Sequence, residues 1–184
     1  ETDKGLVKAP IRLYDKQLFD ALSIPEKGLI RQEAKKYADA KAHIYQMQTP
    51  DDALILNRDN IWWKYFLAKK PKSKIYFTSM RPLPRSVDGL YVKKGYAVLR
   101  LGGKERNIIS VEKFRKERGD HNCADLLAAL LAALLFDDKI RPTQKMLQDL
   151  PVPMMRQEVI YSDKVLTVVN DSAATSPDAT IAAM

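Results

Sequence analysis

The chain has 184 residues, 46% of them hydrophobic and 29% charged, so it can bury a core and is not compositionally disordered. Its formal net charge of +8 is compatible with binding nucleic acid and equally with binding anionic small molecules such as nucleoside triphosphates. One cysteine and two histidines exclude an intrachain disulfide framework and a cysteine-rich or histidine-rich metal site. No signal-peptide pattern opens the chain, and the apolar run Leu126 to Phe136 is too short to span a bilayer. We therefore expect a cytoplasmic protein.

Hydrophobic spacing predicts a series of helices and buried strands. The first half of the chain is expected to form a helix over 29–48, a strand over 53–57, a helix over 61–68 and a strand over 74–79. A hairpin over 90–101, closed by two glycines, follows. The expected elements after it are a helix over 123–136, a short helix that starts at 141–143 and ends near 150, and strands over 158–161 and 165–169. The helix over 123–136 is apolar on nearly every side and is expected to pack between layers. Alternating helices and buried strands indicate an α/β fold.

The chain is expected to contain parts of two domains. Residues 1–29 give no assignable pattern, residues 30–150 form one domain, and Pro151-Val152-Pro153 is the expected linker to a second domain over 151–184. The second domain is expected to open with the two strands predicted over 158–169.

The last segment has the pattern of a strand, a polar loop and the start of a helix. A turn at Asn170-Asp171-Ser172 follows an apolar run, Thr175 or Ser176 is a helix N-cap, and Pro177 and Asp178 stand in the first turn. Short polar side chains beside a helix N-terminus are a common geometry for anion binding.

Three blocks of the sequence resemble the Mur ligase family, and in particular its branch that adds D-glutamate to UDP-N-acetylmuramoyl-L-alanine. They are Tyr37–Tyr45 with Leu54–Asn57, then Gly119-Asp120-His121-Asn122 with Ala128-Ala129, then Arg156-Gln157-Glu158 with Asn170–Thr180. The resemblance covers about residues 30–184. It implies the second half of a central ATP-binding domain, with a mostly parallel sheet and an antiparallel hairpin, followed by the first strands of a Rossmann-like C-terminal domain.

In the first block, Lys41 matches a family lysine that is carbamylated and helps hold a magnesium ion. Lys41 shares a helical face with Ala34, Ala38 and Tyr45, so we expect it to be partly desolvated. Desolvation favours the neutral amine, the form that reacts with carbon dioxide. The alternative is a lysine that snorkels from a half-buried helix.

In the second block, Asn122 matches the family asparagine that lies beside the adenine of ATP. Asp125 stands where the family has a second asparagine, which puts that second adenine contact in question. The alternative is that Asp120 and Asn122 only cap a core helix. Cys123 is expected to be a packed structural thiol.

In the third block, Arg156 matches an arginine that reaches from beyond the linker to the nucleotide phosphates. Asp171, Ser172 and Thr175 match the loop that meets ATP and the incoming amino acid, at the closing interface. Ala173 replaces a lysine of this loop and Ser176 replaces an asparagine. The alternative is that Asn-Asp-Ser is only favourable turn chemistry.

The resemblance implies an amide ligase that uses ATP and Mg²⁺ and forms an acyl phosphate. Its substrates would be UDP-N-acetylmuramoyl-L-alanine and D-glutamate, and neither a membrane nor a specific nucleic acid is expected as partner. The sequence has no phosphate loop of the Gly-x-x-x-x-Gly-Lys-Ser/Thr type, so the 184-residue chain is expected to be inactive by itself. Two alternatives remain: another amide ligase of the superfamily, and a catalytically dead relative kept as a scaffold or binding module.

Overall fold

The computed structural model describes residues 32, 35–151, 154–155 and 158–173. These residues fall into two compact units, one over Ala42–Leu150 and one made of the described residues on either side of it. The predicted division into domains at residue 150 stays a prediction. The helix predicted after Pro177 lies outside the described residues.

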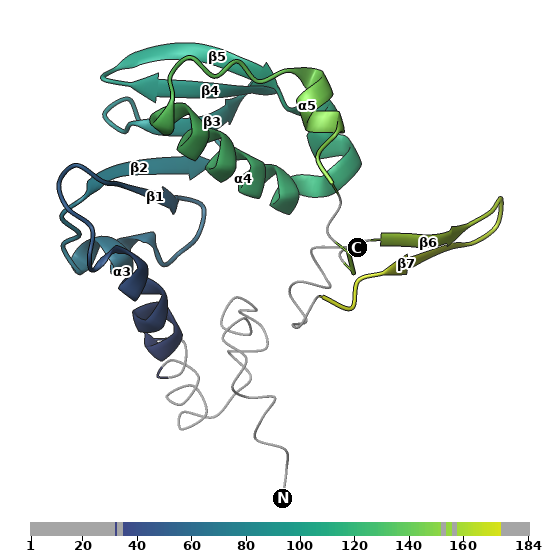
Figure 1. Ribbon diagram of the computed structural model, residues 1–184, viewed down its shortest axis with the longest axis horizontal. Helices are drawn as coiled ribbons and strands as arrows, with labels where there is room; N and C mark the ends of the chain where they lie inside the picture. Colours follow the sequence, from purple (N-terminus) through teal and green to yellow (C-terminus); the bar gives the residue numbers. More distant parts are fainter. Residues whose placement is uncertain (1–31, 33–34, 152–153, 156–157, 174–184) are drawn as a thin grey trace, which may run out of the picture. The chain divides into compact units, whose positions relative to one another are not determined.

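A five-stranded mixed sheet forms the centre of the unit Ala42–Leu150 (Figure 1). Its strands are, in order, β1 (Ala53–Asn57), β2 (Lys74–Ser79), β3 (Gly89–Lys93), β4 (Tyr96–Leu101) and β5 (Lys104–Ser110). β1, β2 and β3 run parallel, whereas β3, β4 and β5 run antiparallel. The predicted α/β fold with an antiparallel hairpin is confirmed.

Strand β5 was not predicted, because the hairpin was expected to end at Gly102-Gly103. Those glycines instead turn the chain into a further strand, with φ values of +55° and +77°. The first residues of β5, Lys104 to Asn107, are charged or polar and exposed. An edge strand tolerates this composition because only one side of it pairs with the sheet.

Apolar side chains cover both faces of the sheet, since successive residues of a strand point to opposite sides. Leu90 and Val92 of β3 join one cluster, whose other members include leucines of α4 (Glu112–Phe136). Tyr91 joins the other cluster, which also contains Tyr45 of η3 (His43–Tyr45) and Phe66 of α3 (Trp63–Ala68). A short helix, α5 (Gln144–Gln148), adds Leu147 to the α4 side, and the Thr143 side chain caps it by accepting a hydrogen bond from the Met146 N–H.

Helix α4 begins earlier than predicted, at Glu112, and packs on one face of the sheet instead of between layers. Leu127 and Leu131 are fully buried, while Phe136 is 92% exposed. By length and composition alone α4 is long and apolar enough to cross a membrane. Its buried leucines make it the core helix of this unit.

The described part of the second unit contains two strands at the predicted places. β6 (Glu158–Ser162) and β7 (Thr167–Asn170) form an antiparallel pair with an irregularity between Val159 and Tyr161. Asp163 closes the connecting turn by accepting hydrogen bonds from the backbone N–H groups of Val165 and Leu166.

The connection between the parallel strands β2 and β3 is a loop, residues 80–88, and it returns very close to β2. A Cβ atom at Gly89 would lie 1.9 Å from the carbonyl oxygen of Phe77, so only glycine fits there. Leu83 anchors the middle of the loop and is 4% exposed. A loop with a buried turn needs donors for its carbonyl groups.

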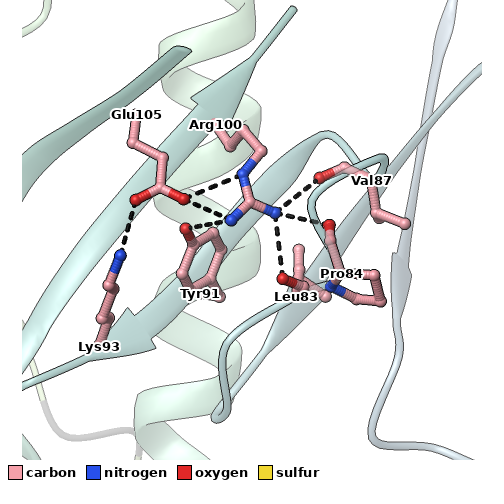
Figure 2. Close-up of polar contacts among 7 residues, drawn as sticks. All are labelled: Leu83, Pro84, Val87, Tyr91, Lys93, Arg100 and Glu105. Atoms are coloured by element: carbon pink, nitrogen blue, oxygen red, sulfur yellow. Dashed lines mark hydrogen bonds and ion pairs between the residues drawn. The ribbon is translucent and has the colours of Figure 1, made fainter. Parts of the chain in front are cut away.

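Arg100 of β4 supplies those donors (Figure 2). Its Nη1 donates to the carbonyl oxygens of Leu83 at 3.1 Å, Pro84 at 2.6 Å and Val87 at 3.4 Å. Its Nη2 donates to the Tyr91 hydroxyl at 2.7 Å, and the guanidinium pairs with the Glu105 carboxylate. The Arg100 side chain is only 5% exposed, so this charge is buried and fully partnered.

The hydrogen-bond network around Arg100 shifts the pKa values of two side chains. Hydrogen bonds from Lys93, Tyr91 and Arg100 lower the pKa of Glu105 to about 2. Burial, reinforced by the neighbouring Glu105 carboxylate, raises the pKa of Tyr91 to about 12. Both shifts favour the state with Glu105 charged and Tyr91 protonated across the neutral pH range.

Replacing Arg100 should destabilise the sheet. Arg100→Met leaves three loop carbonyls without their donor, so we expect the free energy of unfolding to fall by about 2–4 kcal/mol. Arg100→Lys should recover only part of the lost free energy of unfolding, because lysine lacks the planar guanidinium that donates to several acceptors at once. Urea denaturation of the 184-residue chain measures the loss, and Arg106→Met on the exposed part of β5 is the matched control. Equal stability of the two methionine variants would contradict the structural role of Arg100.

Acid should weaken the same network. Because the pKa of Glu105 is lowered from 4.5 to about 2 in the folded state, its contribution is complete above about pH 4.5 and is lost as pH falls toward 2. Glu105→Gln should therefore flatten the dependence of unfolding free energy on pH in this window, measured by denaturation at a series of pH values. Glu117→Gln, an exposed glutamate of α4, should leave the slope as it is. If Glu105→Gln left the pH dependence of the unfolding free energy unchanged, the stabilising role given to the Glu105 carboxylate would be refuted.

Candidate functional site

The second block of the sequence lies at a break in helix α4. Gly119 has φ 80° and ψ 170°, which is not helical and favours glycine. A Cβ atom there would also lie 3.3 Å from Cε1 and Nδ1 of the His121 ring. The helix was expected to begin at Cys123; in the structure its second segment begins directly after Gly119, so Asn122 lies in the first turn of that segment.

The carboxamide of Asn122 is held by two neighbours. Its Nδ2 lies 2.7 Å from the carbonyl oxygen of Arg118 and 3.0 Å from Nε2 of His121. A carbonyl oxygen only accepts, so the group facing Arg118 must be the amide nitrogen, and His121 Nε2 must then be the acceptor of the second bond. Both amide hydrogens are used, whereas Oδ1 has no hydrogen-bond partner among the described residues.

An ion pair spans the break. Nε and Nη2 of Arg115 donate to the two carboxylate oxygens of Asp120 at 2.5 and 2.9 Å. This bidentate pair lowers the pKa of Asp120 and raises that of Arg115. The Asp120 side chain thus joins the two segments of α4 instead of only capping one of them.

Cys123 and Asp125 lie on opposite sides of the same helix. Cys123 is fully buried, and burial raises the pKa of its thiol to about 11, as expected for a packed structural cysteine. Asp125 is exposed and stands three positions after Asn122, so the two residues share a face of the helix.

Lys41 is exposed, in contrast to the partial burial expected for it. The buried side of residues 35–45 is formed by Ala38, Ala42 and Tyr45. Lys41 lies one turn after Tyr37, and its Nζ is 5.4 Å from the centre of that ring. The expectation was wrong because the buried side is centred on Ala42, between Ala38 and Tyr45, whereas Lys41 lies beside the exposed Tyr37.

The described residues do not by themselves form a magnesium site. No three His, Cys, Asp or Glu side chains come together within the part of the chain that the structure describes. A carbamate on Lys41 would supply oxygen ligands of the kind Mg²⁺ prefers, but further ligands would have to come from other groups.

Asp59, which the sequence interpretation missed, connects the carboxyl ends of β1 and β2. Its carboxylate accepts hydrogen bonds from Ser79 Oγ at 3.0 Å, from the Met80 N–H at 2.6 Å and from Arg81 Nη2 at 3.3 Å. Carboxyl ends of parallel strands are where α/β proteins bind ligands, so a polar residue just after a buried strand was the available signal.

The loop after β7 has the turn chemistry predicted for it. The N–H and Oγ of Ser172 donate to Oδ1 of Asn170 at 3.2 and 2.8 Å. The Ala173 N–H donates to the carbonyl oxygen of Met155 at 2.9 Å, which brings the loop beside the residue before Arg156. Asp171 is partly buried. Arg156 and Thr175 themselves lie outside the described residues.

Comparison with known proteins gives several relatives with one shared description. UDP-N-acetylmuramoylalanine–D-glutamate ligase of Staphylococcus carnosus is 35% identical over 79% of this chain and 30% of its own length. The Symbiobacterium thermophilum ligase is 29% identical over 82% of the chain and 32% of its own length. That of Desulfitobacterium hafniense (strain DSM 10664 / DCB-2) is 27% identical over 96% of the chain and 40% of its own length.

No protein-family model matches the chain. The chain spans about a third of the length of the curated relatives it matches. The repeated match, together with the α/β sheet, identifies this chain as a member of the Mur ligase family, similar to one part of the ligases named above.

Proposed function

We propose that the protein to which this chain belongs is an ATP-dependent ligase that adds D-glutamate to UDP-N-acetylmuramoyl-L-alanine. The observation that carries the proposal is the match of about four-fifths of the chain to ligases of that description. The acceptor that Asn122 presents at the helix break supports it, because the 6-amino group of adenine is a donor that such an oxygen binds.

Each predicted site residue has one role in this proposal. Asn122 binds the adenine, and Arg156 neutralises phosphate charge. Asp171, Ser172 and Thr175 form the loop that meets nucleotide and amino acid. Lys41, as its carbamate, contributes to magnesium binding, and the bound ion offsets charge on the transferred phosphoryl group.

Ala173 favours a second candidate function, a catalytically inactive relative kept as a binding module. The lysine that the resemblance leads us to expect at this position would place a cation beside the reacting phosphate, and alanine supplies none. A ligase assay of the full-length protein, which follows ADP release dependent on both substrates, separates the two candidates.

The role of Lys41 is testable by chemical rescue. In the full-length ligase, Lys41→Ala should remove most activity because the carbamate is lost, and bicarbonate or a short carboxylate should restore part of it. Lys35→Ala, an exposed lysine on the same helix, is the matched control and should remain active. Full activity of the Lys41→Ala variant would make Lys41 an ordinary surface lysine.

The role of Arg156 is testable by comparing turnover with substrate binding. An arginine that meets phosphate charge only after domain closure acts more in the transition state than in the ground state. Arg156→Ala should therefore lower kcat more than it weakens binding of the UDP substrate, and Arg156→Lys should recover only part. Arg106→Ala is the control. Equal losses in turnover and in binding would exclude this role.

A further inference from the structure

We propose that the outer side of helix α3, with the lysine-rich turn after it, is a surface that binds an anionic lipid bilayer peripherally. This α3 surface consists of three apolar or aromatic side chains and three lysines: Ile61, Trp62, Tyr65, Lys64, Lys69 and Lys70. The inference goes beyond the ligase activity and does not depend on it. A membrane partner was not expected from the sequence, where only a spanning segment was sought; a peripheral contact needs none.

Positive charge is concentrated around the α3 surface. The segment Asn60–Val87 contains five lysines, two arginines and no acidic residue, so it carries most of the chain's formal net charge of +8. The carboxylates that flank it are already hydrogen-bonded: Asp59 to donors at the end of β2, and Asp88 to the Gly102 N–H. All five lysines are exposed, at positions 64, 69, 70, 72 and 74. A partner that complements this charge is anionic.

The aromatic rings of α3 are divided between its two sides. Trp63 and Phe66 pack toward the sheet, and the centre of the Trp63 ring lies 5.6 Å from that of Phe77. Trp62 and Tyr65 are half-buried and belong to neither of the two apolar clusters formed by the described residues. Their ring centres are 5.5 Å apart. Residues three apart on a helix share a face, so these two rings form the outer side of α3.

Lysine ammonium groups lie close to the rings of α3. Lys69 Nζ is 5.0 Å from the centre of the Tyr65 ring, and Lys64 Nζ is 5.5 Å from that of Trp63. Ile61, next to the outer ring pair, is 63% exposed. Aromatic rings favour the boundary between headgroups and acyl chains, and lysines beside them reach the anionic headgroups. An exposed aliphatic residue, two rings and several lysines have the composition of an interfacial anchor.

The ring geometry favours lipid over nucleic acid. Stacking of nucleic-acid bases needs aromatic rings with open faces. The Lys69 ammonium lies over one face of Tyr65, and Trp62 meets Tyr65 at an interplanar angle of 90°, so the pair offers no parallel stacking platform. A bilayer interface accepts ring edges and an isoleucine side chain in any orientation, and its anionic headgroups attract each nearby lysine.

The test is co-sedimentation of the full-length protein with lipid vesicles. One set contains phosphatidylcholine alone, and the other contains about one-third phosphatidylglycerol, which makes it anionic. We expect binding to the anionic vesicles only. Raising the salt concentration from about 0.1 M to about 0.5 M should lower the partition coefficient at least about tenfold, because the Debye length shortens.

A double lysine variant tests the charge. Lys69→Gln with Lys70→Gln should lower the partition coefficient for anionic vesicles about 10- to 25-fold, since each lysine near the surface contributes about fivefold. Lys139→Gln with Lys145→Gln is the matched control, because these two lysines are also exposed but lie in the segment after α4. The control should bind as the unmodified protein does.

A single variant tests the apolar contact. Trp62→Ser should lower the partition coefficient about fivefold, because the ring no longer leaves water on binding. Phe136→Ser is the control, since Phe136 is 92% exposed at the end of α4. If Trp62→Ser does not fold, Ile61→Ser replaces it and should weaken binding in the same direction, because the Ile61 side chain is mostly exposed and contributes little to the core.

Absence of binding to anionic vesicles, or equal binding to neutral ones, would overturn the proposal. Equal weakening by the Lys69/Lys70 variant and by its control would overturn it too, because overall charge alone would then explain the binding. Binding of a single-stranded oligonucleotide that requires Trp62, without binding to vesicles, would assign the α3 surface to nucleic acid instead. None of these results changes the ligase assay, so the proposed function stands or fails separately.

Discussion

The buried guanidinium of Arg100 is the interaction on which the mixed sheet depends. The sheet changes from parallel to antiparallel pairing at β3, and the chain reaches β3 through a loop instead of a helix. The loop carbonyls of Leu83, Pro84 and Val87 all take hydrogen bonds from this one side chain, as Figure 2 shows. Glu105 balances its charge, so a buried cation remains compatible with folding.

The candidate site depends on that sheet through helix α4. The helix rests on β3 and β4 through Leu90, Leu99 and its own buried leucines, and the break at Gly119 interrupts it just before that apolar segment. Each named position of the motif Gly-x-His-Asn then has a physical reason. Gly119 permits the non-helical backbone and the close approach of the His121 ring, and His121 Nε2 accepts a hydrogen bond from the Asn122 amide. The Asn122 Nδ2 is thereby used, which leaves its Oδ1 as the acceptor.

Sequence patterns predicted the apolar elements well and the polar ones poorly. The bounds of β1 and β2 were predicted correctly, because short apolar runs between turn residues can form little else than buried strands. β5 and the first segment of α4 were missed because their charged residues carry no hydrophobic period. Whether a polar segment such as β5 pairs with the edge of a sheet also depends on how the rest of the sheet is assembled, which a local sequence pattern does not contain.

For the candidate site, the sequence predicted which residues take part but not how their side chains are arranged. The resemblance pointed to Asn122, and only the structure shows that Arg118 and His121 fix its amide. Lys41 was expected to be partly buried and is exposed. The sequence shows which residues share a helical face, but the segments that pack on the helix decide which face is buried. The role of Arg100 was not predictable, since its partners are loop backbone groups and residues of other strands. Asp59 was missed although it stands just after a buried strand, and its partners at the end of β2 are known only from the structure.

The most direct measurement of the central claim, that the break in α4 is where a purine nucleotide binds, is photolabelling of the full-length protein. An ATP analogue with an azide on the adenine ring would be bound, irradiated and mapped by peptide mass spectrometry. The account predicts that the label falls on the peptide around His121 and Asn122, and that excess ATP prevents it. Labelling elsewhere in the protein that ATP prevents, with none at this peptide, would contradict the account.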